Sequence, residues 1–187
     1  MNTGTVAARY AKALLEYALE KGQDGTVYNE MTVLRDRMSS IHEIHERLAD
    51  PTVSLQVKQS LLETAITDSK EPPCQVTRDF LQLVLRSQRE DMLLFMASAY
   101  IDRYRRHYGI VPVSLVTAVP EKEDHRARLA ALVARVTKGT PEWSYTVDPR
   151  IEGGFILSVD GYRLDASVAS QLERIRKELI EKNNRII

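Results

Sequence analysis

The spacing of apolar residues changes once along this chain, near Tyr108-Gly109, and this change limits the possible folds more than any other feature. Before it, apolar side chains recur every three or four residues, which is the spacing of one helix face. After it, they alternate with polar residues, as in a strand with one buried face. We therefore predict an α+β protein, with a six-helix bundle over residues 1–108 and a small α/β domain over residues 109–187.

Six apolar stripes in the first part predict six short amphipathic helices that pack as a bundle. The stripes cover residues 6–17, 27–38, 41–48, 57–66, 76–84 and 92–104. Thr5 and Ser54 are expected to cap the first and fourth helices, because a hydroxyl can accept hydrogen bonds from free backbone N–H groups. Gly22 suits the end of the first helix. The residues of the fourth helix that are expected inside are Val57, Leu61, Ala65 and Ile66.

The second part predicts strand, helix, strands and helix in that order. Alternation over residues 111–119 indicates a strand, and Pro112 suggests that this strand starts irregularly or lies at an edge. A helix is expected from about Lys122 to Thr137, with its apolar side inward. Strands follow around residues 143–147 and 155–159, and a final helix begins near Ser167. At about 78 residues, such a domain is close to the lower limit for independent stability.

Two short motifs in this part predict local structure rather than a reactive site. Asp160-Gly161 predicts a hairpin with a type I′ turn, since that turn needs positive φ at both central residues. Asp165 and Ser167 are expected to cap the last helix rather than to form an acid/base pair.

Composition excludes several classes of protein. The 26 basic and 26 acidic residues cancel, which disfavours general nucleic-acid binding. Cys74 is the only cysteine, so an intrachain disulfide and a multi-thiolate zinc site are excluded. Apolar runs are too short for a membrane span, and the N-terminus lacks the pattern of a signal or transit peptide. We expect a soluble protein of a reducing compartment.

Candidate reactive residues are few, and each has a simpler structural explanation. His42 and His45 lack the spacing and the third ligand of a helical zinc motif, so no metal is expected. Cys74 has no activating partner in the sequence. Arg103, Arg105 and Arg106 complement a helix C-terminus, although a minority reading makes them an RNA-binding patch. An alternative reading makes the chain a small anion- or nucleotide-binding enzyme that uses the Gly153-Gly154 turn, but glycine pairs also allow close backbone approach.

Five segments, in order, resemble the delta subunit family of bacterial F-type ATP synthases, whose mitochondrial counterpart is the oligomycin sensitivity-conferring protein. They are Ala8-Arg9-Tyr10-Ala11-Lys12-Ala13-Leu14; Asp50-Pro51 with Val53 and Lys58; Phe80-Leu81 with Leu83 and Arg89; Gly109, Val111, Val113, Ala118 and Pro120; and Asp148-Pro149, Ile151, Gly153-Gly154, Asp160, Asp165, Ser167, Val168 and Leu172. Glu152 departs from the pattern, which has an apolar residue there, and we expect this carboxylate to face solvent or a partner.

The resemblance implies a non-catalytic stator subunit without cofactors, which ties the catalytic head to the peripheral stalk. It implies that the bundle holds N-terminal helices of alpha subunits and that the second domain holds the C-terminal ends of b subunits. It also implies a peripheral location on the cytoplasmic side of the bacterial inner membrane. The candidate groove residues carried over are Tyr10, Ala13, Leu14, Phe80 and Leu83. Each could equally belong to the bundle core, because both roles use the same apolar spacing.

Overall fold

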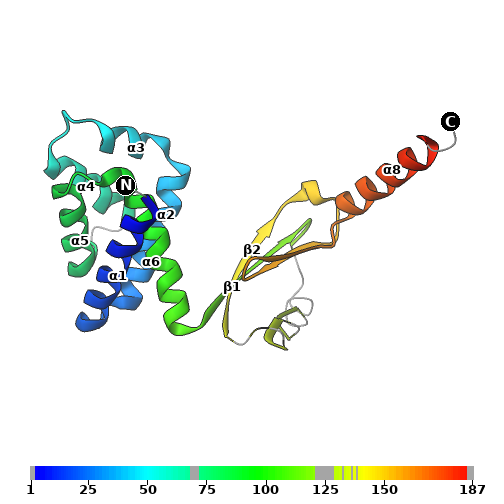
Figure 1. Ribbon diagram of the computed structural model, residues 1–187, viewed down its shortest axis with the longest axis horizontal. Coiled ribbons are helices and arrows are strands. Elements are labelled where there is room, and N and C mark those ends of the chain that lie inside the picture. The colour runs from blue at the N-terminus through cyan, green and yellow to red at the C-terminus, as the bar shows by residue number, and fades with distance from the viewer. Residues whose placement is uncertain are drawn as a thin grey trace. The chain divides into compact units, whose positions relative to one another are not determined.

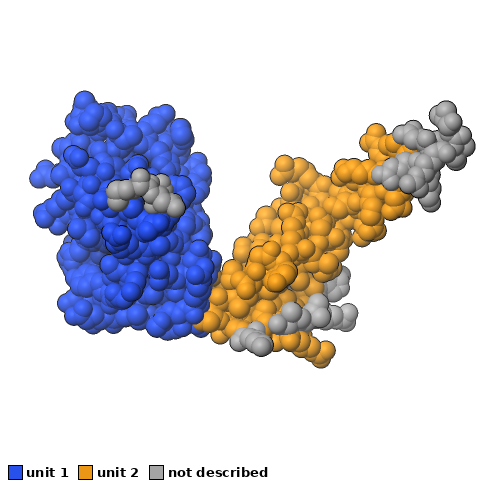
Figure 2. Space-filling model, in the orientation of Figure 1, with its two compact units in different colours: residues 1–108 blue, residues 109–187 orange. Residues whose placement is uncertain are grey.

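The computed structural model describes residues 3–67, 72–120, 129–131, 133–135, 137 and 139–184. The chain forms two compact units, Met1–Tyr108 and Gly109–Ile187 (Figure 2). The first is helical and the second is built on a mixed β-sheet, so the predicted α+β class is confirmed.

Six α-helices make up the first unit, as the six apolar stripes predict (Figure 1). They are α1 (Thr3–Lys21), α2 (Asp24–Ser40), α3 (His42–Ala49), α4 (Leu55–Ile66), α5 (Gln75–Arg86) and α6 (Leu93–Tyr108), with a single 3₁₀ turn, η1 (Glu90–Met92), before α6. Their apolar faces meet in one core, in which Met31, Leu34, Leu62, Leu81 and Met96 are completely enclosed. Burial of side chains of this size is the main source of stability for such a bundle.

Two of the three residues that were predicted to begin or end a helix do so in the structure. Gly22 adopts φ +65° directly after α1, a conformation that costs glycine little. The Ser54 hydroxyl accepts a hydrogen bond from the backbone N–H of Val57 and so caps α4. The expected cap at Thr5 is wrong, because α1 already begins at Thr3 and Thr5 lies inside it.

The buried face of α4 agrees with the prediction at its end, where Ala65 and Ile66 are buried, and differs from it at its start. Val57 is 58% exposed, whereas Lys58 is only 5% exposed. The Lys58 ammonium donates hydrogen bonds to the Leu48 carbonyl at the end of α3 and to Glu90 Oε1 in η1, the latter at 2.7 Å. A buried charge is tolerated only when it is paired and hydrogen-bonded, so this lysine joins three elements across the unit.

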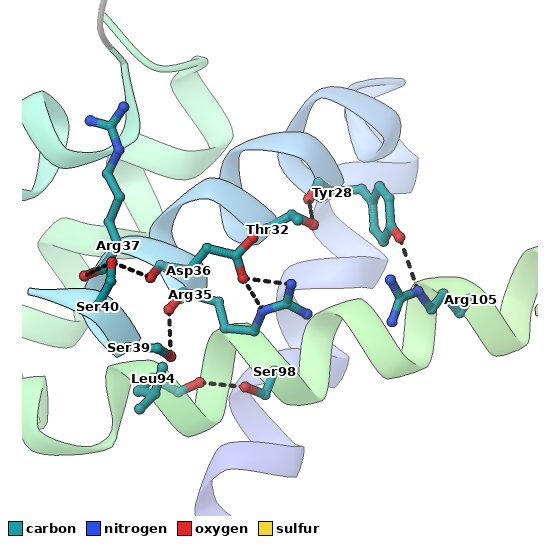
Figure 3. Close-up of polar contacts among 10 residues, drawn as sticks. All are labelled: Tyr28, Thr32, Arg35, Asp36, Arg37, Ser39, Ser40, Leu94, Ser98 and Arg105. Atoms are coloured by element: carbon teal, nitrogen blue, oxygen red, sulfur yellow. Dashed lines mark hydrogen bonds and ion pairs between the residues drawn. The ribbon is translucent and has the colours of Figure 1, made fainter. Parts of the chain in front are cut away.

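In α2 and α6, serine and threonine hydroxyl groups form hydrogen bonds with backbone carbonyls of their own helix (Figure 3). The hydroxyls of Thr32 and Ser98 donate to carbonyls four residues earlier, at 2.8 and 2.9 Å. Between the helices, Arg105 Nε donates to the Tyr28 hydroxyl at 3.0 Å and its guanidinium lies over the Tyr28 ring. One arginine of the predicted basic cluster therefore holds α6 against α2.

The second unit contains a four-stranded sheet in the order β2-β1-β3-β4. The strands are β1 (Ile110–Thr117), β2 (Thr140–Val147), β3 (Phe155–Val159) and β4 (Tyr162–Asp165). β1 and β2 are parallel, and the other two pairs are antiparallel. β1 is therefore an interior strand and not an edge strand. Pro112 fits there because the pairing with β3 begins only at Val113.

One face of this sheet carries the core of the second unit. Val113, Leu115 and Leu157 are buried together with Val133. Val133 belongs to the helix predicted over residues 122–137, of which the structure describes only residues 129–131, 133–135 and 137; the rest lies outside the described residues. The 129–131 and 133–135 segments are helical, which agrees with the prediction as far as it can be compared.

The turn between β3 and β4 and the last helix complete the unit. Asp160 and Gly161 have φ +46° and +84°, the signs that a type I′ turn needs. A single 3₁₀ turn, η2 (Pro149–Ile151), precedes β3, and α8 (Val168–Asn184) follows β4. No helix in the described part of the chain is both long enough and apolar enough to cross a membrane.

Candidate functional site

A groove of about 360 Å³ between α1 and α5 brings together all five candidate residues. Its lining consists of Arg9, Tyr10, Ala13, Leu14, Tyr17, Asp79, Phe80 and Leu83. We call this the α1–α5 groove. The residues come from two helices far apart in sequence that lie against each other in the bundle (Figure 1).

The groove residues divide into a floor and a rim. Leu14 and Phe80 are 3% and 5% exposed, so they form the floor and also belong to the bundle core. Ala13 and Leu83 lie at the rim, where Leu83 is 54% exposed. Because the Leu83 side chain is exposed to solvent in this groove, it does not contribute to the bundle core. The small Ala13 in the same lining leaves room for a helix to approach closely.

Aromatic rings and charges mark the two ends of the groove. At one end, the Tyr10 ring meets Phe80 edge-on, with centroids 6.5 Å apart, and the Arg89 guanidinium lies 5.5 Å from the Tyr10 centroid. At the other end, the Tyr17 hydroxyl donates to Asp79 Oδ2 at 3.1 Å. This hydrogen bond, together with partial burial and the nearby Asp79 and Glu20 charges, raises the pKa of Tyr17. An apolar middle with polar ends suits an amphipathic helix.

The Gly153-Gly154 pair has a structural role in the second unit. Gly154 has φ +71°, and a Cβ atom there would lie 2.2 Å from the Ala166 carbonyl oxygen. The Val168 N–H donates to the Gly153 carbonyl at 3.0 Å. The glycines thus let the chain before β3 contact the chain that enters α8. A Cβ atom at Gly153 would lie 3.0 Å from Val168 Cγ2, so close approach accounts for both glycines without an anionic ligand.

Asp165 and Ser167 hold the start of α8. Asp165 Oδ1 accepts from the N–H and the hydroxyl of Ser167 at 3.0 and 2.6 Å, and its Oδ2 accepts from the Ser170 hydroxyl at 3.0 Å. Ser167 Oγ in turn accepts from the Ser170 N–H at 3.3 Å. These bonds to Ser167 and Ser170 favour the charged carboxylate and lower the pKa of Asp165.

We expect this cap to make the second unit sensitive to acid. Because the folded pKa of Asp165 lies below its ordinary value of 3.8, the stabilisation is present above that pH and is lost as the pH falls through the folded pKa. The difference in urea midpoint between the native chain and Asp165→Ala should therefore narrow below pH 3.8. Trp143 fluorescence reports the transition, since Trp143 is the only tryptophan and lies in β2. Neither variant titrates at this position, so the difference between the native chain and Asp165→Asn should narrow by a similar amount. An Asp165→Ala difference that does not change with pH would contradict the cap.

The exposed side of α8 is a candidate binding surface that was not expected from the sequence. Its apolar side chains are 39–61% exposed. They are Val168, Leu172, Ile175, Leu179 and Ile180. The first four recur at four, three and four residues, the spacing of a seam that packs against another helix. The sequence contains this periodicity, but only the structure shows that the sheet does not cover it.

The remaining candidates are occupied by local contacts. His45 Nε2 lies 3.0 Å from the Met38 carbonyl oxygen. Cys74 Sγ donates to Glu30 Oε2 at 3.2 Å, and burial is the main factor that raises the pKa of its thiol, the opposite of what an activated cysteine requires. Glu152 is exposed, as expected, and has φ +63° at the end of η2.

Comparison with known proteins gives a consistent result over nearly the whole chain. The sequence pattern of the family "ATP synthase delta (OSCP) subunit" matches residues 6–179. The chain is similar to ATP synthase subunit delta of Phocaeicola vulgatus, with 41% identity over 187 residues and full coverage of both chains. It is also similar to ATP synthase subunit delta of Enterococcus faecalis, with 31% identity over 95% of this chain and 97% of that one.

A solved structure is similar as well. It is a chain of the Toxoplasma gondii mitochondrial ATP synthase hexamer, determined by cryo-electron microscopy. The match has a TM-score of 0.62 and 26% identity, and it covers 93% of this chain and 97% of the other.

Proposed function

Because the chain belongs to the ATP synthase delta (OSCP) subunit family, we propose that its two units hold different partners within that complex. The chain is a non-catalytic stator subunit, and it links the catalytic head of the ATP synthase to the peripheral stalk. Such a link works mechanically and needs binding surfaces rather than reactive groups. Two surfaces of the described residues that combine exposed apolar side chains with helical spacing or a groove are the α1–α5 groove and the exposed side of α8.

The α1–α5 groove is proposed to hold the N-terminal helix of an alpha subunit. The single observation that carries this proposal is that the exposed Leu83 of α5 and the exposed Ala13 of α1 line one groove with an apolar floor. An incoming helix would cover Leu83 and pack against Leu14 and Phe80. Tyr10 adds a large apolar ring with a polar tip, a side chain common at binding hot spots.

The apolar stripe of α8 is proposed to bind the C-terminal ends of the b subunits. Leu172, Ile175 and Leu179 are each at least half exposed, and burying them against a helix would stabilise both chains. The capped start of α8 fixes where this stripe begins. Binding would also stabilise the small second unit by mass action. Through these contacts, the protein is proposed to lie peripherally on the cytoplasmic side of the bacterial inner membrane.

A crossed binding experiment tests both assignments. It uses two synthetic peptides: the head peptide, which is the amino-terminal segment of an alpha subunit, and the stalk peptide, which is the carboxyl-terminal segment of a b subunit. Ala13→Trp places a large ring at the groove rim and is expected to weaken binding of the head peptide at least about tenfold, through steric overlap. Ile175→Glu puts a carboxylate in the α8 seam and is expected to weaken binding of the stalk peptide by a similar factor, because the charge must lose its water. Isothermal titration calorimetry on the full chain measures both.

Each variant is the control for the other. Ala13→Trp should bind the stalk peptide normally, and Ile175→Glu should bind the head peptide normally. Far-UV circular dichroism should show both variants folded. If Ala13→Trp binds the head peptide with unchanged affinity, the groove does not form the head contact. If Ile175→Glu binds the stalk peptide with unchanged affinity, α8 does not form the stalk contact.

A further inference from the structure

We propose that the buried Lys58–Glu90 pair positions one end of the α1–α5 groove from outside it. The pair fixes the neighbouring Arg89 against the Tyr10 ring, so Lys58 is a positioning residue for the groove. Neither member of the pair lines the groove. The inference rests on the proposed function of the groove, in which Tyr10 is a binding residue, and it adds two residues that act on the groove without contacting its occupant.

The pair holds η1 against α3 and α4. The Lys58 ammonium donates to Glu90 Oε1 and to the Leu48 carbonyl, so it joins all three elements. Glu90 Oε2 has no hydrogen-bond partner in the described part of the chain, and the bond from the ammonium to Oε1 is therefore what holds this carboxylate. These bonds are directional, and separating the two charges would leave each of them buried without a partner. The position of η1 is set accordingly.

The backbone on both sides of Arg89 is fixed as well. Before it, Gln88 has φ +51°, and the Arg89 N–H donates to the Val84 carbonyl at 3.2 Å, which gives α5 a Schellman ending. After it, the Arg89 carbonyl accepts from the Met92 N–H at 3.1 Å within η1. A left-handed conformation is unfavourable for a residue with a side chain and persists only where other contacts impose it. The Glu90 contact, two residues on, is suited to impose it.

The Arg89 side chain connects this turn to the groove. Its guanidinium lies over the Tyr10 ring, 5.5 Å from the ring centroid, and the same ring meets Phe80 edge-on. A cation over the face of a tyrosine ring is favourable, and a ring that is already held loses less conformational freedom when a partner binds it. A displaced η1 would take Arg89 away from the ring. The Lys58–Glu90 pair therefore contributes to the affinity of the groove through Arg89.

The position of Arg89 can be measured without a partner. In the ¹⁵N-labelled full chain, the ring current of Tyr10 should shift the Arg89 Nε–Hε signal, which is assigned by its loss in Arg89→Ala. Lys58→Met/Glu90→Leu should move this signal toward that of a free arginine side chain, because an apolar contact lacks the directional bonds that fix η1. Met38→Ala is the stability control, since Met38 is 1% exposed and its truncation leaves a cavity in the core. It should leave the signal in place. A native Arg89 signal in the double variant overturns the inference.

Affinity for the head peptide is the second readout, measured by isothermal titration calorimetry on the full chain. Lys58→Met/Glu90→Leu should bind the peptide about twofold to fivefold more weakly than the native chain, which is the value of one cation–π contact at an exposed site. Met38→Ala should bind it with native affinity. If the double variant binds normally and Met38→Ala binds weakly, affinity follows stability, and the pair has only a structural role.

A third comparison tests whether the effect passes through Arg89. In an Arg89→Ala background, the same double substitution should cost no further affinity, since no guanidinium is left to position. A loss in that background equal to the loss in the native background would overturn the inference. If the native chain does not bind the head peptide at all, the proposed function of the groove is wrong, and the Arg89 signal then decides the positioning by itself.

Discussion

Lys58→Met is expected to lower the free energy of unfolding of the helical unit by about 3 to 5 kcal/mol. The Lys58 and Glu90 side chains are 7% and 15% exposed, so their 2.7 Å ion pair is largely removed from water. Methionine fills a similar volume but leaves the Glu90 carboxylate buried without its cation. Glu90 Oε2 already lacks a hydrogen-bond partner among the described residues, and the Leu48 carbonyl would lose its donor too.

Urea unfolding of the full chain, followed by far-UV circular dichroism, measures this loss. Lys12→Met is the matched control, because Lys12 also faces a carboxylate, Glu16 at 3.7 Å, but both side chains are more than 60% exposed. Exposed pairs of this kind contribute at most about 1 kcal/mol. If the two variants lose the same stability, the Lys58 pair is not a buried charge pair.

The double variant Lys58→Met/Glu90→Leu separates the net value of the pair from the cost of breaking it. Removing both charges also removes the uncompensated carboxylate, so much of the loss should be recovered. A double variant as unstable as the single one would mean that shape, and not charge, is the decisive feature at this position.

Gly154→Ala is expected to destabilise the second unit by about 3 kcal/mol or more. The added Cβ would lie 2.2 Å from a backbone oxygen, which cannot rotate away, and φ +71° is itself strained for alanine. A domain of this size has little stability to lose. Trp143 fluorescence should show unfolding at much lower urea, or no folded second unit at all, while the circular dichroism transition of the helical unit stays in place.

Gly161→Ala is the control for backbone strain alone. Gly161 also has positive φ, at +84°, but a Cβ there would meet nothing within 4 Å. Its cost should be about 1 kcal/mol, from the conformation only. If Gly154→Ala costs no more than Gly161→Ala, the contact with Ala166 does not constrain the entry to α8.

The candidate groove shows which part of a binding site can be predicted from the sequence. Tyr10, Ala13, Leu14, Phe80 and Leu83 are candidates because two short segments resemble a known family, and the structure places all five around one groove. Apolar spacing alone does not decide whether each of these residues belongs to the core or to the surface. The structure separates them: Leu14 and Phe80 serve the core and the groove together, whereas Ala13 and Leu83 stay exposed.

Two helices show what spacing cannot decide. In α4, Val57 and Lys58 differ by one position, and the sequence favours burying the valine. Lys58 is buried instead because Glu90 and the Leu48 carbonyl, distant in sequence, meet its ammonium. In α8, the apolar stripe is as regular as those of the bundle helices, yet it stays exposed because the described residues of the unit do not pack over it.

The sequence by itself determined which segments are helices and strands, where the chain changes from one fold to the other, and which turns need glycine. These properties depend on neighbours within a few residues, so local spacing and φ preferences are enough to specify them. Tertiary structure decided whether an apolar stripe is covered, as in the bundle helices, or left exposed for partners, as in α8, and where a charge is buried. Those outcomes depend on contacts between residues far apart in the chain, and local periodicity carries no information about them.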